Sequence, residues 1–506
     1  MRTYTITGCR ALLGEDMACA DAPVDIFLRD GRIERILPAG TASAEGEVID
    51  GRRRLAAPGL INGHYHSHEH FHKGRYDRLP LELWMNFVRP LKPFELTERD
   101  VYLRTLIGAI QSLRSGTTCL MDDMNVSPVL RPEHVEAAYQ AYEDIGIRAL
   151  MGMTLFDRPF FESVPFVDEE FPADMLARLR ATAATPAEEV LAHARRLAAA
   201  RHPREHRVGY LVAPSAPQRC SEAFLKTVRR FADEFDLPTI IHVQETRMQV
   251  VTGQLFYGST MVEYLDRIGF LKPATSLIHA VWLTPAEIAL IARSGASVQH
   301  NPNSNLKLGS GLAPFAALLE AGVNVSLGSD GCGSIETADM LRVVANTALV
   351  HKLRGDDHTR WIGAEEAWRA GTVGGARAIG MADRLGTLEA GREADLVLYR
   401  LDHIAFTPLN DPLRQLVYGE TGAAIDMSFV AGEPVMRDGA LTRIDEAAVL
   451  DEIAEAAERI RPQIAASEAA TGEMGAAYAR IHARCACLPI SPPTYPARLE
   501  ARGQGE

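Results

Sequence analysis

The sequence predicts an α/β fold: a (β/α)₈ TIM barrel, a small composite β-sandwich domain formed by both ends of the chain, and a C-terminal helical extension. Three observations lead to this prediction. From about residue 58, eight short apolar runs alternate with amphipathic helical stretches, a pattern typical of parallel strands closed into a barrel. Turn-separated strands flank that region on both sides. Charged and imidazole residues gather at the carboxyl ends of the apolar runs.

Residues 1–57 are predicted to form the first part of the composite β domain. Its short strands are expected at Thr3–Thr7, Val24–Leu28, Arg32–Leu37 and Glu47–Asp50. The Asp30-Gly31 pair between two of them is a strong hairpin signal. This segment is too small to bury a full core by itself.

The barrel is expected over residues 58–382. Its eight strands are predicted at Ala57–Asn62, Thr117–Met121, Arg148–Thr154, Val208–Ala213, Thr239–Val243, Ser276–Ile278, Ser297–His300 and Val323–Leu327. Amphipathic helices are predicted between them at Arg99–Arg114, Pro132–Ile145, Ser221–Phe235, Pro285–Ser294 and Leu312–Glu320.

A long connection over residues 156–206 separates the third predicted strand from the fourth. It begins with several phenylalanines and continues as helices over Met175–Ala181 and Pro186–Ala200. A connection of this length suggests a lid or a subunit contact, and a surface helix pair is the alternative.

The last quarter of the chain returns to short strands. Residues 383–445 are predicted to complete the composite β domain, with strands at Ile425–Ala431 and Glu433–Met436. Residues 446–506 are predicted to form an Ala/Glu-rich helix over 446–480, followed by a proline-containing tail.

Composition excludes several classes of partner. The formal net charge is −13 and no block of basic residues stands out, so we expect neither nucleic acid nor a membrane surface as a partner. No apolar run approaches the ~18 residues that suggest a membrane span. Seven scattered cysteines and an N-terminus without a signal-peptide pattern indicate a cytoplasmic protein.

A metal site is predicted at the carboxyl ends of the strands. His64 and His66 are separated by one residue at the end of the first barrel strand, so their side chains point to the same side of an extended chain. His242 ends the fifth strand and can complete a three-histidine set. Asp330 follows the eighth strand and offers an oxygen. Imidazole and carboxylate ligands suit a divalent ion such as Zn²⁺.

Two further residues can supply proton chemistry at such a metal. Bound Zn²⁺ lowers the pKa of its water from about 15.7 to roughly 7, which gives a nucleophile at neutral pH. Asp330 and His279 can orient that nucleophile, and Glu245 can carry a proton to a ring nitrogen or leaving group. Each residue alone has a structural alternative: a buried histidine is often a satisfied core residue, and Asp330 precedes Gly331 as a turn former would.

The order and context of these residues resemble the amidohydrolase superfamily, and most closely its cytosine deaminase-like, chlorohydrolase-like and S-adenosylhomocysteine deaminase-like branch. The resemblance covers about residues 1–440. It rests on Pro58-Gly-Leu-Ile-Asn-Gly-His64-Tyr-His66, His242-Val-Gln-Glu245, His279-Ala-Val-Trp-Leu, His300-Asn-Pro-Asn-Ser-Asn-Leu-Lys-Leu-Gly-Ser-Gly311 and Gly328-Ser-Asp330-Gly.

The resemblance implies roles for these residues. His64, His66, His242 and Asp330 would bind one metal ion, and Glu245, His279 and Asp330 would be catalytic. Binuclear relatives use a carboxylated lysine at the end of strand four, and the stretch Val208–Arg219 has none. We therefore predict a single divalent ion, with Zn²⁺ favoured and Fe²⁺ as the alternative.

The substrate pocket is expected to include Trp84, Ser215, Gln218, Trp282 and Asn303. Two departures argue against an adenosine-type substrate. Nucleoside-processing relatives carry a histidine where this chain has Ser215, and a ribose-binding glutamate near the position of Pro93.

The histidines of the segment His68-Glu-His70-Phe-His72 lie beside the predicted site. They are expected to line the substrate entrance or to lie on a solvated loop. A second metal site is the alternative.

The function that these inferences favour is hydrolytic deamination of a small amino-substituted nitrogen heterocycle with release of ammonia. The retained Glu245 supports it, because an amine leaving group needs a proton and chloride does not. Ring-opening C–N hydrolysis or dechlorination is the enzymatic alternative, and a non-catalytic metal-binding scaffold is the alternative of another class. We expect a homo-oligomer, a dimer or tetramer.

Overall fold

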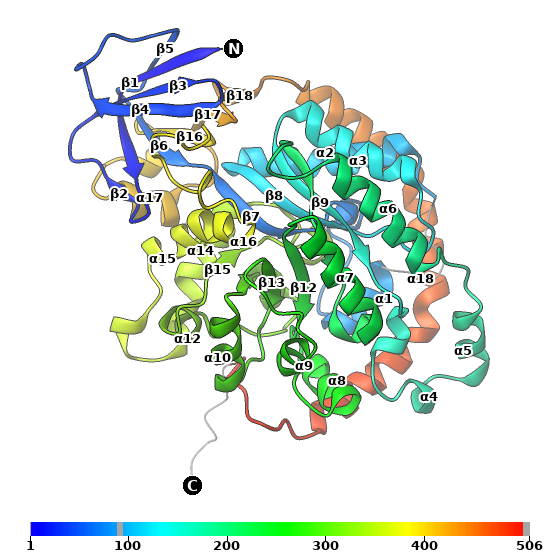
Figure 1. Cartoon of the computed structure of the whole chain (residues 1–506). Coiled ribbons are helices and arrows are strands. Elements are labelled where there is room, and N and C mark those ends of the chain that lie inside the picture. The colour runs from blue at the N-terminus through cyan, green and yellow to red at the C-terminus, as the bar shows by residue number, and fades with distance from the viewer. Residues whose placement is uncertain (1, 89–94, 499–506) are drawn as a thin grey trace.

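The computed structural model describes residues 2–88 and 95–498, in which helices combine with several β-sheets (Figure 1). Two parallel sheets occupy the middle of the chain. One contains β7 (Leu60–Tyr65), β8 (Thr117–Met124), β9 (Arg148–Leu155), β10 (Val208–Tyr210) and β11 (Ala213–Pro214). The other contains β12 (Thr239–Val243), β13 (Thr275–His279), β14 (Ser297–His300) and β15 (Val325–Leu327). Every residue of β7, β8 and β9 is buried, as expected for parallel strands covered on both faces.

Main-chain contacts join the two parallel sheets at both of their outer strands. Val212, beside β11, forms a parallel bridge with Thr239 of β12. On the other side, the Asp330 N–H after β15 donates to the His64 carbonyl of β7 at 2.9 Å. The ends of β7 and β15 are thereby held side by side.

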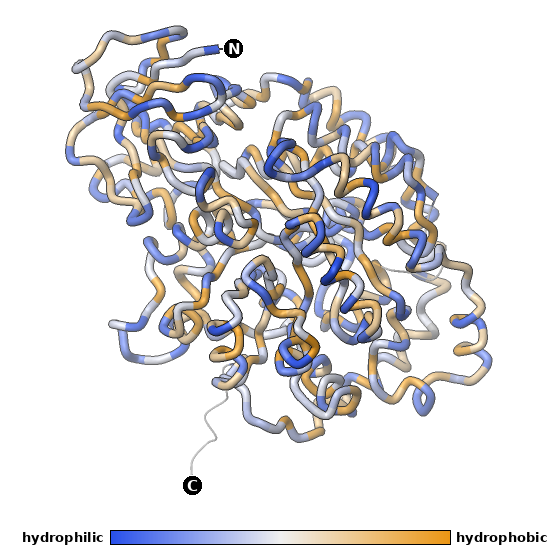
Figure 2. The backbone as a smooth tube through the Cα atoms, viewed as in Figure 1, coloured by the Kyte–Doolittle hydropathy of each residue, from blue (hydrophilic) through white to orange (hydrophobic). Residues whose placement is uncertain are grey.

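Helices follow most of these strands and surround them in Figure 1. They are α1 (Leu81–Val88), α2 (Glu98–Arg114), α3 (Pro132–Ile145), α7 (Glu222–Glu234), α8 (Arg247–Tyr257), α9 (Met261–Arg267), α10 (Pro285–Ser294), α11 (Pro302–Lys307), α12 (Phe315–Glu320), α13 (Cys332–Ile335), α14 (Met340–Val350), α15 (Ala364–Arg369), α16 (Gly375–Ala378) and α17 (Pro412–Gly419). Figure 2 shows hydrophilic and hydrophobic residues interspersed along helices such as α7, which suits helices that cover a core with one face.

Strands from both ends of the chain share one ten-stranded sheet. It contains β1 (Thr3–Leu13), β2 (Ala18–Cys19), β3 (Val24–Arg29), β4 (Arg32–Pro38), β5 (Glu47–Asp50), β6 (Arg54–Pro58), β16 (Leu396–Arg400), β17 (Ile425–Val430), β18 (Glu433–Arg437) and β19 (Ala440–Leu441). The two halves meet where β6 pairs antiparallel with β16. These strands are joined by hydrogen bonds in a single sheet, and the predicted sandwich packing of that sheet stays a prediction.

The strand predicted at Ala57–Asn62 is wrong in its bounds, because that apolar run serves two sheets. Pro58 ends β6 and pairs with Leu396 of β16, whereas Leu60 begins β7 and pairs with Thr117 of β8. Gly59 lies between them, where an added Cβ would come within 2.1 Å of the Thr118 hydroxyl. Hydrophobicity alone cannot show where β6 ends and β7 begins, because both strands are buried.

The segment 156–206 packs against the C-terminal helix of the same chain. It contains α4 (Val167–Glu170), α5 (Ala173–Arg180) and α6 (Ala187–Ala200), preceded by a 3₁₀ turn at Phe160–Ser163. α18 (Glu446–Cys487) is longer than the predicted 446–480. A shared apolar cluster includes Phe161, Phe171 and Leu176 from the segment and Tyr478 and Ile481 from α18.

Among the helices of the described residues, none combines the length and apolar composition that a bilayer crossing requires.

Candidate metal centre and catalytic pocket

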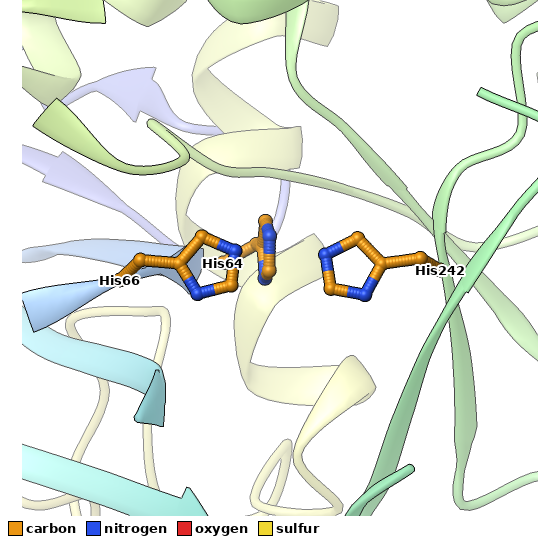
Figure 3. A group of neighbouring side chains, drawn as sticks. All are labelled: His64, His66 and His242. Atoms are coloured by element: carbon orange, nitrogen blue, oxygen red, sulfur yellow. The ribbon is translucent and has the colours of Figure 1, made fainter. Parts of the chain in front are cut away.

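Three histidines from two strands converge at one point. His64 and His66 lie at the end of β7, two residues apart, and His242 lies on β12. Figure 3 shows the rings of His66 and His242 directed toward each other with His64 between them. The centroid of the His64 ring is 4.6 Å from that of His66 and 4.9 Å from that of His242.

Backbone carbonyls fix two of these rings. The Nδ1 atom of His66 lies 2.7 Å from the carbonyl oxygen of Asp123, and the Nδ1 atom of His242 lies 2.8 Å from that of Ser215. Each contact makes Nδ1 the donor, which leaves Nε2 with its lone pair for a ligand. His64 is fully buried, and neither of its ring nitrogens has a hydrogen-bond partner.

Asp330 brings a carboxylate to the same point from the loop after β15. Its Oδ1 lies 3.5 Å from Nε2 of both His64 and His66. Although burial would raise the pKa of this carboxyl, the nearby imidazoles of His64, His279 and His66 hold it well below its usual range. The residue has a φ of +66°, a left-handed conformation that is uncommon outside glycine and is found at functional sites.

The donor set fits a divalent metal. Ligand atoms of His64, His66 and His242 lie within 4.8 Å of one another, and so do those of His64, His279 and Asp330. Both groups include His64, so they describe one centre. Burial lowers the pKa of His242 well below its ordinary value, which keeps the imidazole neutral as a ligand must be. One of the two unpartnered ring nitrogens of buried His64 would gain a partner in such an ion.

Glu245 and His279 lie beside this centre. The Nε2 atom of His279 is 3.5 Å from Oε2 of Glu245 and 3.9 Å from Oδ2 of Asp330. Asn305 holds the other ring nitrogen of His279 through its Oδ1 atom at 2.9 Å. Burial lowers the pKa of His279 to about 4. Burial and the charge of Asp330 raise the pKa of Glu245 well above its usual value, so this carboxyl is suited to hold a proton.

A cavity opens onto the centre. Trp84, Ser215 and Gln218 line it, together with His66, His242, Glu245, His279 and Asp330. The predicted pocket position near Pro93 lies outside the described residues.

Trp282 and Asn303 are not among the described residues that line the cavity, contrary to expectation. The indole N–H of Trp282 donates to the Ser310 carbonyl at 3.0 Å, and its ring packs with Val250 and Ala497. Asn303 instead accepts a hydrogen bond from the side chain of Asn346 at 2.7 Å. Core packing is the common fate of aromatic residues, and the sequence held no signal against it here.

The three additional histidines do not gather at a second centre. Cys332 Sγ lies 3.3 Å from His70 Nε2, and the Tyr65 hydroxyl lies 3.0 Å from His70 Nδ1. His68 accepts from the Asn125 N–H at 3.2 Å, and the Tyr76 hydroxyl lies 3.5 Å from His72. All three are buried, so they are not on a solvated loop. His68 and His72 line a second, larger cavity that shares Phe160 and Arg219 with the first.

Sequence reasoning missed two acidic residues of the cavity wall. Glu69 and Glu82 both line the cavity and are only 2% and 3% exposed. Glu82 lies between apolar residues of α1. Glu69 lies among histidines for which the sequence offered a second metal site as an alternative. Phe160 and Val164 bring the 156–206 segment to the same wall. A buried acidic residue within an apolar helix is the signal that could have identified Glu82.

Comparison with known proteins agrees with this geometry. The sequence model of the amidohydrolase family matches residues 55–435. A 5′-deoxyadenosine deaminase from Methanopyrus kandleri is 33% identical over 82% of this chain and 89% of its own length. A 5-methylthioadenosine/S-adenosylhomocysteine deaminase from Pyrococcus furiosus is 32% identical over 84% of this chain and 94% of its own length.

A solved structure shares the fold. An adenosine deaminase from Xanthomonas campestris with bound zinc superposes with a TM-score of 0.80 and 30% sequence identity. The match covers 91% of this chain and 98% of that one.

Proposed function

The chain belongs to the amidohydrolase family, and we propose that it is a metal-dependent deaminase that removes ammonia from an amino-substituted nitrogen heterocycle. It is a hydrolase that acts on carbon–nitrogen bonds. The single observation that carries the proposal is Glu245, a buried carboxyl 3.5 Å from His279 at the wall of the cavity.

We infer that the two parallel sheets form one closed (β/α)₈ barrel. The Val212–Thr239 bridge and the Asp330–His64 hydrogen bond support closure at both junctions. The ten-stranded sheet is inferred to be a separate small domain. In support, its own apolar cluster contains residues such as Tyr4, Ile26, Leu396 and Phe429, all from the two ends of the chain.

His64, His66, His242 and Asp330 are proposed to hold one divalent ion. Zinc is the metal we favour, because three imidazoles and one carboxylate suit it and the Xanthomonas campestris structure contains it. When bound, such an ion supplies a water that ionises near neutral pH. Side chains of the protein would then orient the attacking water and transfer protons.

Glu245 is proposed to move protons within the cavity. A pKa raised well above the usual value favours the protonated carboxyl, which can deliver its proton to a ring nitrogen or to the departing amine. His279 and Asp330 would orient the attacking water, since both point to the region between Glu245 and the histidines. The contact with Asn305 fixes the orientation of the His279 ring.

The substrate is proposed to be a small heterocycle with an exocyclic amine. The relatives are named for adenosine-derived substrates. The family resemblance, however, implies a histidine in nucleoside-processing members at the position of Ser215 in this chain. The side chain of Ser215 is part of the cavity wall, and its carbonyl orients His242. A smaller residue there leaves space for a ring of different shape.

Ammonia release from a panel of 5′-modified adenosines, pterins, pyrimidines and triazines tests the proposal. The expected result is ammonia in equal amount to the deaminated product for at least one amine, with a turnover number about 10² to 10⁴-fold lower after Glu245→Gln substitution. Hydrolysis of a heterocyclic amide or chloride, with no amine consumed, would instead establish the alternative reaction. A protein without any turnover would support a metal-binding scaffold.

A further inference from the structure

The cavity beside the metal centre is rich in carboxyl groups. Glu69, Glu82, Glu245 and Asp330 all line it, and Arg219 is the only arginine or lysine among its described lining residues. Asp330 faces the metal ligands and Glu245 serves proton transfer in the proposed function. Glu69 and Glu82 remain without a role.

Several hydrogen-bond donors of the wall already have partners within the protein. Ser163 donates to the Phe160 carbonyl at 2.6 Å, and Thr252 donates to the Met248 carbonyl at 2.8 Å. The Trp84 indole donates to the Gly333 carbonyl at 3.1 Å. Arg219 donates its Nε–H to the Arg158 carbonyl at 3.0 Å and lies over the Phe156 ring.

Two acceptors of the same wall lack a donor. Oε2 of Glu82 and Oε1 of Gln218 have no hydrogen-bond partner, although both residues are more than nine-tenths buried. Oε1 of Glu82 accepts from the Thr246 hydroxyl. The other carboxylate oxygen lies 3.6 Å from Nδ1 of His482 of α18, close enough for an ion pair with a protonated imidazole but too far for a hydrogen bond. A buried carboxylate oxygen without a donor is costly, so a ligand that provides one would be favoured.

Glu69 lines the same cavity. Its Oε2 accepts from the Gly333 N–H at 3.2 Å, and this anchors the carboxyl beside the metal-binding loop. Both Glu82 and Glu69 contribute, after burial and Asp330, to raising the pKa of Glu245. All three carboxyl groups also line the same cavity.

We propose that Glu82 and Glu69 form a subsite for a cationic, N–H-rich part of the substrate, an amidine- or guanidine-like group on the heterocycle. This inference rests on the proposed function and narrows its substrate class. A planar amidinium presents paired N–H donors that match a carboxylate, and charge-assisted hydrogen bonds of this kind are strong. A site built to accept such donors discriminates strongly against an isostere that lacks them.

The test compares benzamidine with benzamide, a cationic and a neutral ligand of nearly the same shape. Calorimetric titration would measure both dissociation constants on the metal-loaded full chain. Wild type is expected to bind benzamidine about tenfold or more tightly than benzamide, and Glu82→Gln and Glu69→Gln should each reduce that ratio toward one. Glu162→Gln is the matched control, because Glu162 adjoins wall residue Ser163 but lines only the second cavity.

Melting temperature and metal content of each variant show whether it is intact. A ratio near one in wild type would overturn the inference, and so would a preference that survives in both intact variants. The two proposals fail separately. Ammonia release without a preference for benzamidine would support the deaminase and contradict the subsite. A preference for benzamidine without ammonia release from any amine would support the subsite and contradict the deaminase.

Discussion

At the scale of single residues, the proposed role of each histidine depends on which of its two ring nitrogens already has a hydrogen-bond partner. The Nδ1 atoms of His66 and His242 face backbone carbonyls, and that of His279 faces Asn305. Their Nε2 atoms are therefore the ones available at the centre. Such second contacts fix the tautomer and the ring orientation of metal-site histidines.

Replacing Glu245 by Gln should remove proton transfer and keep the metal. We expect the turnover number for ammonia release to fall by about 10² to 10⁴-fold, because this is the usual contribution of a general acid or base. Metal content per chain, measured by atomic emission, should equal that of wild type. An intact Glu245→Gln protein with undiminished turnover would remove Glu245 from the mechanism.

Replacing Asn305 by Ala should release the His279 ring. We expect the turnover number to fall about tenfold to a hundredfold with little change in KM and no loss of metal. Asn303→Ala is the matched control, since Asn303 is two residues away and pairs with Asn346 outside the cavity. Equal losses in both variants would indicate a general structural effect.

The sequence predicted the residues whose positions follow from strand ends, and it failed where packing decides. His64, His66, His242 and Asp330 could be grouped because the carboxyl ends of parallel strands meet at one edge. Trp282 could not be assigned, because its indole is satisfied by Ser310, which is distant in sequence. Glu82 escaped notice because only the fold turns that helix position toward the cavity.

At the scale of elements, the 156–206 segment and α18 together form one wall of the active-site region. The segment supplies Phe160 and Val164 to the cavity, and α18 supports it from outside through Tyr478 and Ile481. The sequence located both elements but could not pair them, since helical periodicity does not reveal which apolar face meets which. The lid, the subunit contact and the surface helix pair that the sequence left open for this segment all stay predictions.

Replacing Ile481 by Ala should loosen that wall. Ile481 is fully buried, and deletions of this kind cost about 2–5 kcal/mol of unfolding free energy. We expect a lower melting temperature and a raised KM. Leu450→Ala on the same helix is the control, because Leu450 is 46% exposed. Indistinguishable melting temperatures for the two variants would contradict the packing role of Ile481.

At the scale of the whole molecule, the ten-stranded sheet is connected to the parallel strands by the polypeptide chain itself and by buried ion pairs. The apolar run across Gly59 passes from β6 into β7. Arg148 of β9 is buried, contacts Glu393, and donates through Nε to Asp395 at 2.9 Å. The sequence could not predict this pairing, because its partners are more than 240 positions apart.

Replacing Arg148 by Met should leave the buried carboxylates of Glu393 and Asp395 without the positive charge and the hydrogen bonds of the Arg148 side chain. Breaking a buried ion pair on one side costs about 3–5 kcal/mol, so we expect a clear fall in the midpoint of denaturant unfolding. Arg52→Met is the control, since the Arg52 side chain is 80% exposed in its pair with Asp50. If the two midpoints shift equally, Arg148 does not stabilise the junction.

The most direct test of the account is ammonia release by the full chain before and after removal of its metal. With an amino-substituted heterocycle from the panel, the metal-loaded protein should release one ammonia for each product formed. The chelated protein should release none, and added Zn²⁺ should restore the activity. Ammonia release that persists unchanged in the metal-free protein would contradict a centre built by His64, His66, His242 and Asp330.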